Sequence, residues 1–293
     1  MYQPTVPCQP PSRRLVICLI GLTICSVAAL SSGKCEIGDC VNGKDILERV
    51  LIVMAMEGEA QPLVEHYGLT KVVSPPWPAS LPLVAYTGQV HGMQLHLVTN
   101  GKDATHGVDL VATTPACVNA YASIVAFDPQ LVISAGTAGG FASRGAEIGD
   151  VFLSSKCIFH ARRIPFGPAY EAYGLGSYEG PRLANLAQQA GCKTGVVSTG
   201  DSFDIVPSDL EIMNREGAAI KEMEAAAVAQ VCQQLNVMYF ALKSVTDIVD
   251  GDKATGDEFA TNFAAAAAAL KEKMIAILEL AAPIPLSEWQ AQE

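Results

Sequence analysis

Apolar and polar residues follow a recurring pattern along the chain, in which a short apolar segment leads directly into polar or glycine-rich residues. In the clearest case Met238–Leu242 is apolar and aromatic, as expected of a strand buried on both faces of a sheet, and Lys243, Thr246 and Asp247 follow it. Ligands of open α/β sheets bind beyond the carboxyl ends of the strands, so we expect chemistry at this switch. Asp247 is a candidate proton donor, because the apolar residues after it would raise the pKa of its carboxyl group.

The same pattern defines the other expected elements. Strands are predicted at Glu48–Ala55, at the start of Leu131–Phe141, and at Gly149–Leu153, Thr194–Ser198 and Ala218–Lys221, with a hairpin formed by Leu83–Tyr86 and Met93–Val98. Helices are predicted at Gly101–Phe127, Pro181–Ala190, Pro207–Asn214, Glu222–Leu235 and Asp257–Ala281, and residues 166–180 are expected to form a mobile loop. This order predicts a single three-layer α/β domain, with a mixed central β-sheet flanked by helices.

The first 45 residues differ in character from the rest and are predicted to be a leader. Arg13 and Arg14 precede the apolar run Leu15–Leu30, which ends in small residues, as in a secretory signal peptide. The run is short for a membrane span of about 20 residues, although an uncleaved anchor is an alternative. The expected division is a leader at 1–45, a catalytic domain at 46–285 and a tail at 286–293. The leader predicts the secretory pathway or a membrane-anchored protein, with a cytoplasmic or organellar location as the alternative.

Composition excludes several classes of function. The chain has a net charge of -11 and a pI near 4.9, which argues against nucleic-acid binding. Half of its residues are hydrophobic and 17% are charged, so a sizeable core is expected. The nine cysteines include no C-x-x-C pair and no zinc-ligand spacing, so no metal site is expected. The four later cysteines lie in apolar or alanine-rich contexts and are predicted to be buried free thiols: Cys117, Cys157, Cys192 and Cys232.

Several polar or glycine-rich positions fall at predicted strand ends, and each has an ordinary structural interpretation. Glu59 could simply favour a helix N-terminus, the glycines from Gly136 onward could form a tight turn, and Asp247 could cap a turn. Phe203 and Glu224 stand at two further strand ends. Because the carboxyl ends of neighbouring strands meet at one edge of a sheet, the convergence of these positions favours a ligand site over five separate structural roles.

Five motifs together resemble one known family. They are AMEGEA (55–60), SAGTAGGF (134–141), STGDSFD (198–204), EMEAAAVA (222–229) and SVTDIVDGD (244–252). In this order they resemble the 5'-methylthioadenosine/S-adenosylhomocysteine nucleosidases of the nucleoside phosphorylase superfamily, over about residues 48–282. The FHARRIP segment and Lys243 ahead of SVTD resemble the plant-type branch.

The resemblance implies hydrolysis of the N-glycosidic bond of methylthioadenosine, which yields adenine and 5-methylthioribose. It implies that Asp247 protonates adenine N7, that Glu59 activates water and that Glu224 binds the ribose hydroxyls. An acid at the leaving group, a base at the water and a carboxylate beside a cationic sugar are what this chemistry requires. The resemblance further implies binding roles for Phe203 stacked on adenine, the backbone of Asp204 at its Watson–Crick edge, Met223, Thr137 and Thr246.

The resemblance leaves other points open. Bacterial members usually have arginine where Lys243 stands, and lysine cannot make the same bidentate contact, so the role of Lys243 in substrate binding is open. Members also differ in whether they accept S-adenosylhomocysteine. No cofactor is implied. The expected partners are a small nucleoside substrate and a second copy of the chain in a homodimer, with membrane contact through the leader alone.

Two alternative functions remain. A phosphorolytic relative would use phosphate in place of water, but phosphorylases carry an arginine where Ser134 stands, and the carboxylate of Glu59 would repel phosphate. A non-catalytic, exported nucleoside-binding or storage protein could dispense with the acid or the base. The presence of Glu59, Glu224 and Asp247 together favours the enzyme.

Overall fold

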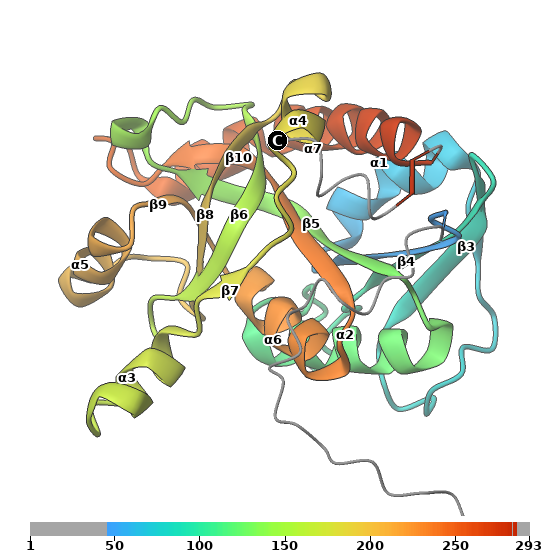
Figure 1. Ribbon diagram of the computed structural model, residues 1–293, viewed down its shortest axis with the longest axis horizontal. Coiled ribbons are helices and arrows are strands. Elements are labelled where there is room, and N and C mark those ends of the chain that lie inside the picture. The colour runs from blue at the N-terminus through green and yellow to red at the C-terminus, as the bar shows by residue number, and fades with distance from the viewer. Residues whose placement is uncertain (1–45, 283, 286–293) are drawn as a thin grey trace, which may run out of the picture. The chain divides into compact units, whose positions relative to one another are not determined.

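The computed structural model describes residues 46–282 and 284–285. In this part of the chain ten strands form one mixed sheet with helices against both of its faces (Figure 1). The predicted three-layer α/β class is therefore confirmed. The predicted leader and nearly all of the predicted tail lie outside the described residues.

The sheet has an open half and a half that closes on itself. The open half runs from β2 (Thr70–Lys71) through β3 (Val84–Val90), β4 (Met93–Thr99) and β1 (Arg49–Met54) to β5 (Leu131–Gly140). The closed half continues through β9 (Ala218–Glu222), β8 (Lys193–Thr199), β6 (Val151–Phe159) and β10 (Met238–Ile248). Because β10 also pairs with β5 in parallel, these five strands form a ring, a closure that the sequence pattern did not predict.

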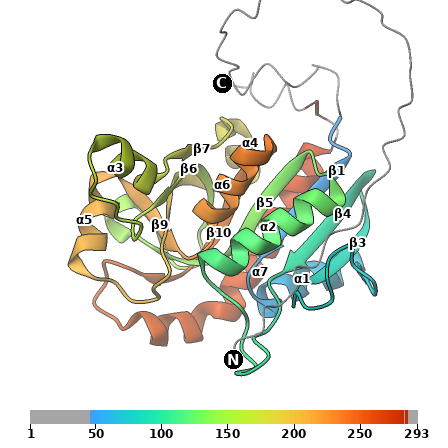
Figure 2. The same cartoon turned by 90° about the horizontal axis from the view of Figure 1, so that it is seen from below.

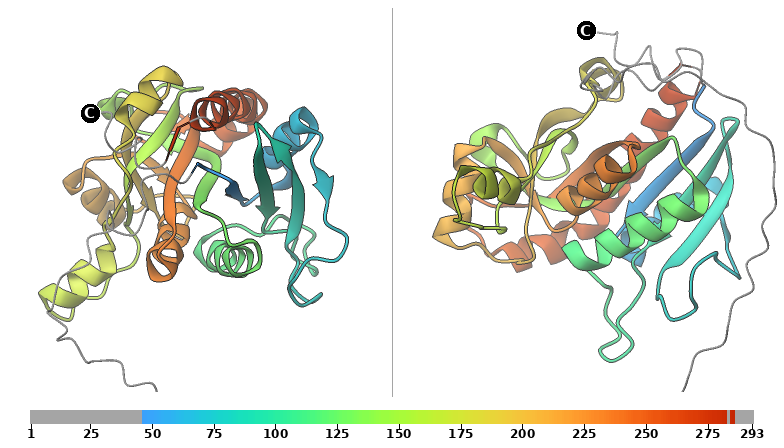
Figure 3. Two further views of the ribbon diagram at one scale, coloured as in Figure 1. Left: turned by 45° about the vertical axis from the view of Figure 1, so that its right-hand side comes forward. Right: turned by 60° about the horizontal axis from the view of Figure 1, so that its bottom comes forward.

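The layers arise from the alternation of side chains along the buried strands. In β1, Val50, Ile52 and Met54 belong to the cluster that packs on α1 (Glu57–Tyr67) and α7 (Thr255–Ala281). Leu51 and Val53 belong to the cluster on the other face, beneath α2 (Thr113–Phe127) and α6 (Ala225–Leu235). Figures 2 and 3 show α2 and α6 side by side on that face, with α7 on the opposite side of the sheet. Strand β1 thus has apolar residues at every position that faces a helix layer.

Smaller elements lie around the closed half of the sheet. They are η1 (Ala142–Arg144), α3 (Pro168–Leu175), β7 (Tyr178–Glu179), α4 (Ala184–Gln189) and α5 (Pro207–Arg215). The prediction of a mobile loop at 166–180 was wrong, because this segment contains α3 and β7. Pro168 begins the helix, and the Arg162 guanidinium donates to the carbonyl oxygens of Tyr173 and Gly174 near its end. These bonds anchor a segment that its glycines and tyrosines had suggested was free.

The predicted helix from Gly101 to Phe127 was too long at its start. Gly101 and Gly107 have positive φ angles, and the chain is helical only from Thr113. The prediction of a buried thiol also fails for Cys117, which is exposed on α2, whereas Cys157 and Cys232 are buried and Cys192 is half-buried.

Strand β10 is longer than its apolar start suggested, and it ends at Ile248. Its polar residues remain in the sheet because β5 and β6 pair with them, and Lys243, Ser244 and Thr246 are fully buried. Asp247 is therefore held on a strand of the central sheet and not on a loop after it. No helix within the described ranges is both long enough and apolar enough to cross a membrane.

Candidate active site

A cavity of about 500 Å³ opens at the carboxyl ends of β1, β5, β9 and β10. This volume suits a nucleoside-sized ligand. Eight of the nine site residues predicted from sequence line it: Glu59, Thr137, Phe203, Asp204, Met223, Glu224, Thr246 and Asp247. Lys243 does not line the cavity. The structure thus brings together residues that lie up to 188 positions apart in the sequence, from Glu59 to Asp247.

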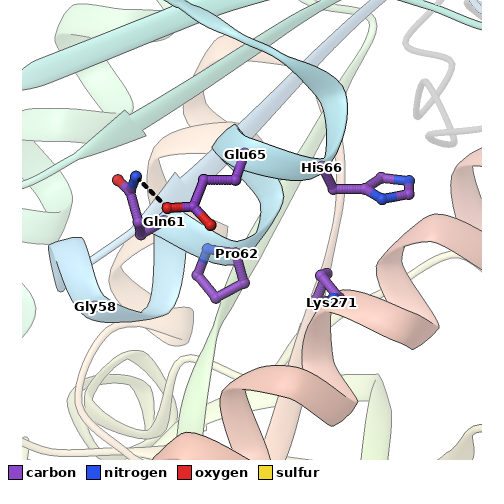
Figure 4. Close-up of a pocket in the computed structure, with 6 residues that line it drawn as sticks. All are labelled: Gly58, Gln61, Pro62, Glu65, His66 and Lys271. Carbon is purple, nitrogen blue, oxygen red and sulfur yellow. Dashed lines mark hydrogen bonds between the residues drawn. The ribbon is translucent and has the colours of Figure 1, made fainter.

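A second hollow lies between α1 and α7, where Gln61, Glu65, His66 and Lys271 contribute polar side chains (Figure 4). Its polar groups do not converge on a point: the Gln61 amide donates to Glu65, and His66 projects away from both. None of the residues predicted for the site lines this hollow. The cavity at the strand ends is therefore the candidate active site.

Glu59 is held in a fixed position on the first turn of α1. Its Oε1 accepts hydrogen bonds from the backbone N–H of Thr137 (2.6 Å) and from the Thr137 hydroxyl (2.7 Å). Gly136 makes this approach possible, because a Cβ there would lie 3.1 Å from the same oxygen. Burial raises the pKa of Glu59, and the two bonds from Thr137 oppose the rise. The result is an oriented carboxyl group whose proton affinity exceeds that of a solvated glutamate, as a general base requires.

Asp247 lies near the end of β10, beside Gly139 of β5. The Thr246 hydroxyl donates to its Oδ1 at 2.7 Å, which orients the carboxyl group. Burial raises the pKa of Asp247, whereas the hydroxyl of Thr246 and the cation of Lys221 oppose the rise. An aspartate with a raised pKa keeps its proton at a higher pH, so this side chain can donate one to a ligand in the cavity.

Glu222 and Glu224 are two residues apart but have different partners. The Oε2 of Glu222 accepts from the backbone N–H groups of Glu224 and Ala225, both at 2.9 Å, and pairs with the Lys243 ammonium at 2.9 Å. Burial opposes ionisation of Glu222, but Lys243 and the Thr199 hydroxyl hold its pKa below the ordinary value. Glu222 is thus an ionised residue that caps the start of α6 by accepting its backbone N–H groups.

Glu224 is less fully bonded and remains available to a ligand. Its Oε1 accepts from the backbone N–H of Ala112 at 2.9 Å, and its Oε2 lies 3.9 Å from the Lys243 ammonium. Burial raises the pKa of Glu224 to about 7, with Lys243 opposing the rise. A positively charged sugar beside it would favour the ionised form, so Glu224 can stabilise such a cation.

Lys243 supports the site from behind. Its side chain is 1% exposed and its ammonium contacts Glu222 and Glu224, but the residue does not line the cavity. The position of Lys243 therefore favours a structural role, in which it pairs with the two glutamates, over direct binding of the substrate. A point charge between two carboxylates needs no bidentate geometry, which suits lysine at this position.

The loop after β8 supplies the aromatic wall of the cavity. Phe203 is 47% exposed and packs edge-on against Phe259 of α7, with ring centroids 5.6 Å apart. An exposed ring at a cavity mouth offers its face to a flat ligand such as a purine. Phe203 was predicted from the sequence but Phe259 was not, because helix periodicity gives no sign that one aromatic residue of a long helix faces a site.

The comparisons with known proteins agree with this geometry. Residues 49–279 match the family model of the phosphorylase superfamily. The chain is 40% identical to a 5'-methylthioadenosine/S-adenosylhomocysteine nucleosidase of Arabidopsis thaliana over 233 residues, which cover 80% of this chain and 91% of the relative. It is 43% identical to a 5'-methylthioadenosine nucleosidase of the same plant over 225 residues, covering 77% and 84%.

The chain belongs to the 5'-methylthioadenosine/S-adenosylhomocysteine nucleosidase family. The resemblance found in the five motifs is thereby confirmed, and the match extends over nearly the whole described region. The solved structure of an Arabidopsis thaliana 5'-methylthioadenosine nucleosidase without ligand superposes with a TM-score of 0.81 at 40% identity, covering 83% of this chain and all of that one. As a nucleosidase-family member, the protein has an N-glycosyl hydrolase fold with the predicted acid, base and ribose carboxylate around one cavity.

Proposed function

We propose that this protein hydrolyses the N-glycosidic bond of 5'-methylthioadenosine and releases adenine and 5-methylthioribose. The observation that carries the proposal is the placement of three carboxyl groups with raised pKa values, Glu59, Glu224 and Asp247, around one nucleoside-sized cavity. Each comes from a different element, so each can address a different part of the substrate. The names of the Arabidopsis relatives support this substrate.

The reaction divides into three roles. Asp247 donates its proton to N7 of the purine, which makes adenine a neutral leaving group. Glu224 stabilises the positive charge that develops on the ribose as the bond breaks. Glu59, fixed by Thr137, removes a proton from the water that attacks the anomeric carbon.

The cavity favours water over phosphate as the nucleophile. Lys221 is the one cationic side chain among its lining residues, and its neighbours include Asp247 on the purine side. Glu59 also lines the cavity, and its carboxylate would repel a phosphate dianion. Hydrolysis therefore fits the charge distribution better than phosphorolysis.

Steady-state adenine release by the full-length protein tests the proposal. We expect turnover of methylthioadenosine by the wild type and a loss of at least 100-fold in kcat for Glu59→Gln, because a positioned base contributes about 10²–10⁴-fold. S-adenosylhomocysteine is assayed in parallel, since the name of one Arabidopsis relative includes this compound and the name of the other does not. A folded wild-type protein that binds adenine but releases none from methylthioadenosine would refute the proposal and would favour a binding protein of this fold.

The protein is further proposed to act as a homodimer. An apolar stripe on α2, made by Val118, Tyr121 and Val125, is exposed on the face opposite to the one that packs on the sheet. The spacing of these residues places them on one side of the helix. Val111, which precedes α2, is also 39% exposed and lines the cavity, so a second copy seated on this stripe would reach the mouth of the site.

The oligomeric state tests the dimer. We expect sedimentation equilibrium to give twice the mass of one chain for the wild type and one chain for Tyr121→Lys. Tyr173→Lys, at a similarly exposed tyrosine of α3, serves as the matched control for an added charge. A wild type that is monomeric at micromolar concentration would contradict this part of the proposal.

Residues 1–45 are proposed to act as a leader that directs the protein to the secretory pathway or anchors it to a membrane. The arginine pair and the apolar run that follows it support this interpretation. Fusion of residues 1–45 to a reporter protein is expected to move the reporter into the membrane or secreted fraction. A reporter that stays in the soluble cytosolic fraction would contradict it.

A further inference from the structure

Lys221 is a buried cation in the wall of the cavity that the family motifs do not include. It lies on β9, lines the cavity and is 8% exposed. Lys221 pairs with Gly139 of β5, and Gly139 pairs with Asp247 of β10, so the three residues form one row across neighbouring strands. Gly139 contributes no side chain between them, and the Lys221 cation acts on the Asp247 carboxyl group by lowering its pKa.

The ammonium of Lys221 binds the backbone of the loop that carries Phe203 and Asp204. Its Nζ donates to the carbonyl oxygen of Ser202 at 3.0 Å and to that of Phe203 at 2.8 Å. The Phe203 carbonyl belongs to the same planar peptide group as the N–H of Asp204. In a trans peptide these two groups point in opposite directions. By holding the carbonyl, Lys221 therefore fixes the direction of the Asp204 N–H.

We propose that Lys221 is a positioning residue that gives the site its preference for 6-aminopurine over 6-oxopurine nucleosides. It does so by preventing a flip of the Phe203–Asp204 peptide. The inference rests on the proposed function, because it assigns the purine to this loop. Adenine presents a hydrogen-bond acceptor at N1, whereas a 6-oxopurine presents an N–H there. A fixed N–H of Asp204 can donate to N1 of adenine but opposes the N1–H of a 6-oxopurine. A peptide that is free to flip could instead offer its carbonyl oxygen to that N1–H.

The cost of turning the peptide explains why a lysine performs this role. Rotation would remove the carbonyl of Phe203 from a buried ammonium, and hydrogen bonds to charged groups are among the stronger ones in proteins. The ammonium would lose one of its two carbonyl partners in a site where burial already lowers its pKa. A neutral side chain of similar length would impose no such penalty.

Lys221 also faces acidic groups, and the test must separate their effect from that of the peptide. Its neighbours are Asp247 of β10, Asp204 of the loop, Glu222 of its own strand and Asp209 of α5. Loss of the cation would change Asp247 and hence kcat, but protonation of N7 is common to both kinds of purine. The ratio of kcat/KM for 5'-methylthioadenosine to that for 5'-methylthioinosine cancels this shared effect and isolates recognition at N1.

The experiment compares Lys221→Met, Lys221→Arg and Lys193→Met in the full-length protein. We expect Lys221→Met to raise KM for methylthioadenosine and to lower the substrate ratio at least tenfold, because sites built for one hydrogen-bond pattern reject the other strongly. Lys221→Arg keeps the cation and the donors, so its ratio is expected to stay within about threefold of the wild type. Lys193 is the matched control, because its Nζ also donates to a backbone carbonyl, that of Gly145 at 2.8 Å, but the residue does not line the cavity. Lys193→Met is expected to leave the substrate ratio unchanged.

A folded Lys221→Met variant with the wild-type ratio would overturn the inference. If Lys221→Met does not fold, Lys221→Gln takes its place, since it removes the charge but keeps a polar group beside the carbonyls, and an unchanged ratio would again overturn it. If the wild type releases no adenine, the proposed function fails separately. The same variants then test the inference by their relative affinity for free adenine and hypoxanthine, with the same loss of preference expected.

Discussion

The ammonium of Lys243 lies 2.9 Å from the Glu222 carboxylate, and both side chains are 1% exposed. The pair joins β10 to the end of β9 and the start of α6. Glu222 in turn accepts the backbone N–H of Glu224, so the position of the proposed ribose carboxylate depends on this buried ion pair. Substrate binding and the stability of the fold are therefore coupled at this point.

Removal of Lys243 is expected to destabilise the protein strongly. Lys243→Met leaves the Glu222 carboxylate buried without its cation, which typically costs about 3–5 kcal/mol. Lys253→Met is the matched control, because Lys253 also pairs with a glutamate but its side chain is 76% exposed, and exposed pairs contribute at most about 1 kcal/mol. Urea unfolding of both variants measures the difference. Equal effects of the two substitutions would contradict the structural role given to Lys243.

Gly139 leaves the space that the Asp247 carboxyl group occupies. A Cβ added at Gly139 would lie 2.8 Å from Asp247 Oδ2 and 2.7 Å from a methyl group of Val249. Gly139→Ala is therefore expected to lower kcat at least tenfold, since small displacements of catalytic groups have large effects on rate.

Gly92→Ala is a control for the substitution itself, because no atom lies within 4 Å of a Cβ at that turn. Gly92 has a positive φ, so Gly92→Ala is expected to cost some stability but no activity. Steady-state kinetics and thermal unfolding of both variants distinguish the two effects. Full activity of a folded Gly139→Ala enzyme would show that Asp247 does not need this position.

The pH dependence of the reaction should reveal the raised pKa of Asp247. The proton donor is active while protonated, so activity is retained below its pKa and is lost as the pH rises through it. Since burial raises this pKa, the alkaline limb of kcat/KM is expected above the ordinary value of 3.8. Lys221 lowers this pKa and Glu258 of α7 raises it, so Glu258→Gln is expected to move the alkaline limb to lower pH. A limb that stays in place in Glu258→Gln would assign it to another group.

Much of the architecture could be predicted from the sequence, because buried strands and long helices have strong apolar patterns. Strand β1 and helix α7 lie within a few residues of their predicted positions. The pairing of β10 with β5, which closes the ring of five strands, could not be predicted, because pairing between strands far apart in the sequence leaves no local pattern. The α3 segment was misjudged because its order comes from the Arg162 side chain and not from its own composition.

The site was predictable to the extent that its residues lie at strand ends. Glu59, Glu224 and Asp247 each follow an apolar segment, and the structure places all three around the cavity. The roles of Lys221 and Glu222 could not be inferred in this way, because they depend on which backbone groups lie opposite them. Lys243 was predicted to bind the ligand because it also follows an apolar segment. Its burial behind two glutamates is a property of the folded sheet and cannot be inferred from the sequence.

The stability of the protein is expected to depend on Glu224 with a defined sign. Its folded-state pKa of about 7 exceeds the ordinary value of 4.5, so between these pH values the folded protein keeps a proton that the unfolded chain has lost. Raising the pH through this range therefore favours unfolding. Glu224→Gln removes the penalty and is expected to be more stable than the wild type by roughly 1–3 kcal/mol at pH 8, but inactive.

The comparison of unfolding free energies at pH 8 and pH 4 checks this expectation. Near pH 4 both states of the wild type carry the proton on Glu224, so the difference between the two proteins should disappear. A Glu224→Gln variant that is less stable than the wild type at pH 8 would show that the ionised carboxylate is favourably bonded in the empty site.

The proposed hydrolysis is tested by adenine release from methylthioadenosine in phosphate-free buffer and in buffer with phosphate, with identification of the sugar product. Because Glu59 is proposed to activate water, we expect equal rates in both buffers and free 5-methylthioribose as the product. Release that requires phosphate and yields a sugar 1-phosphate would contradict it.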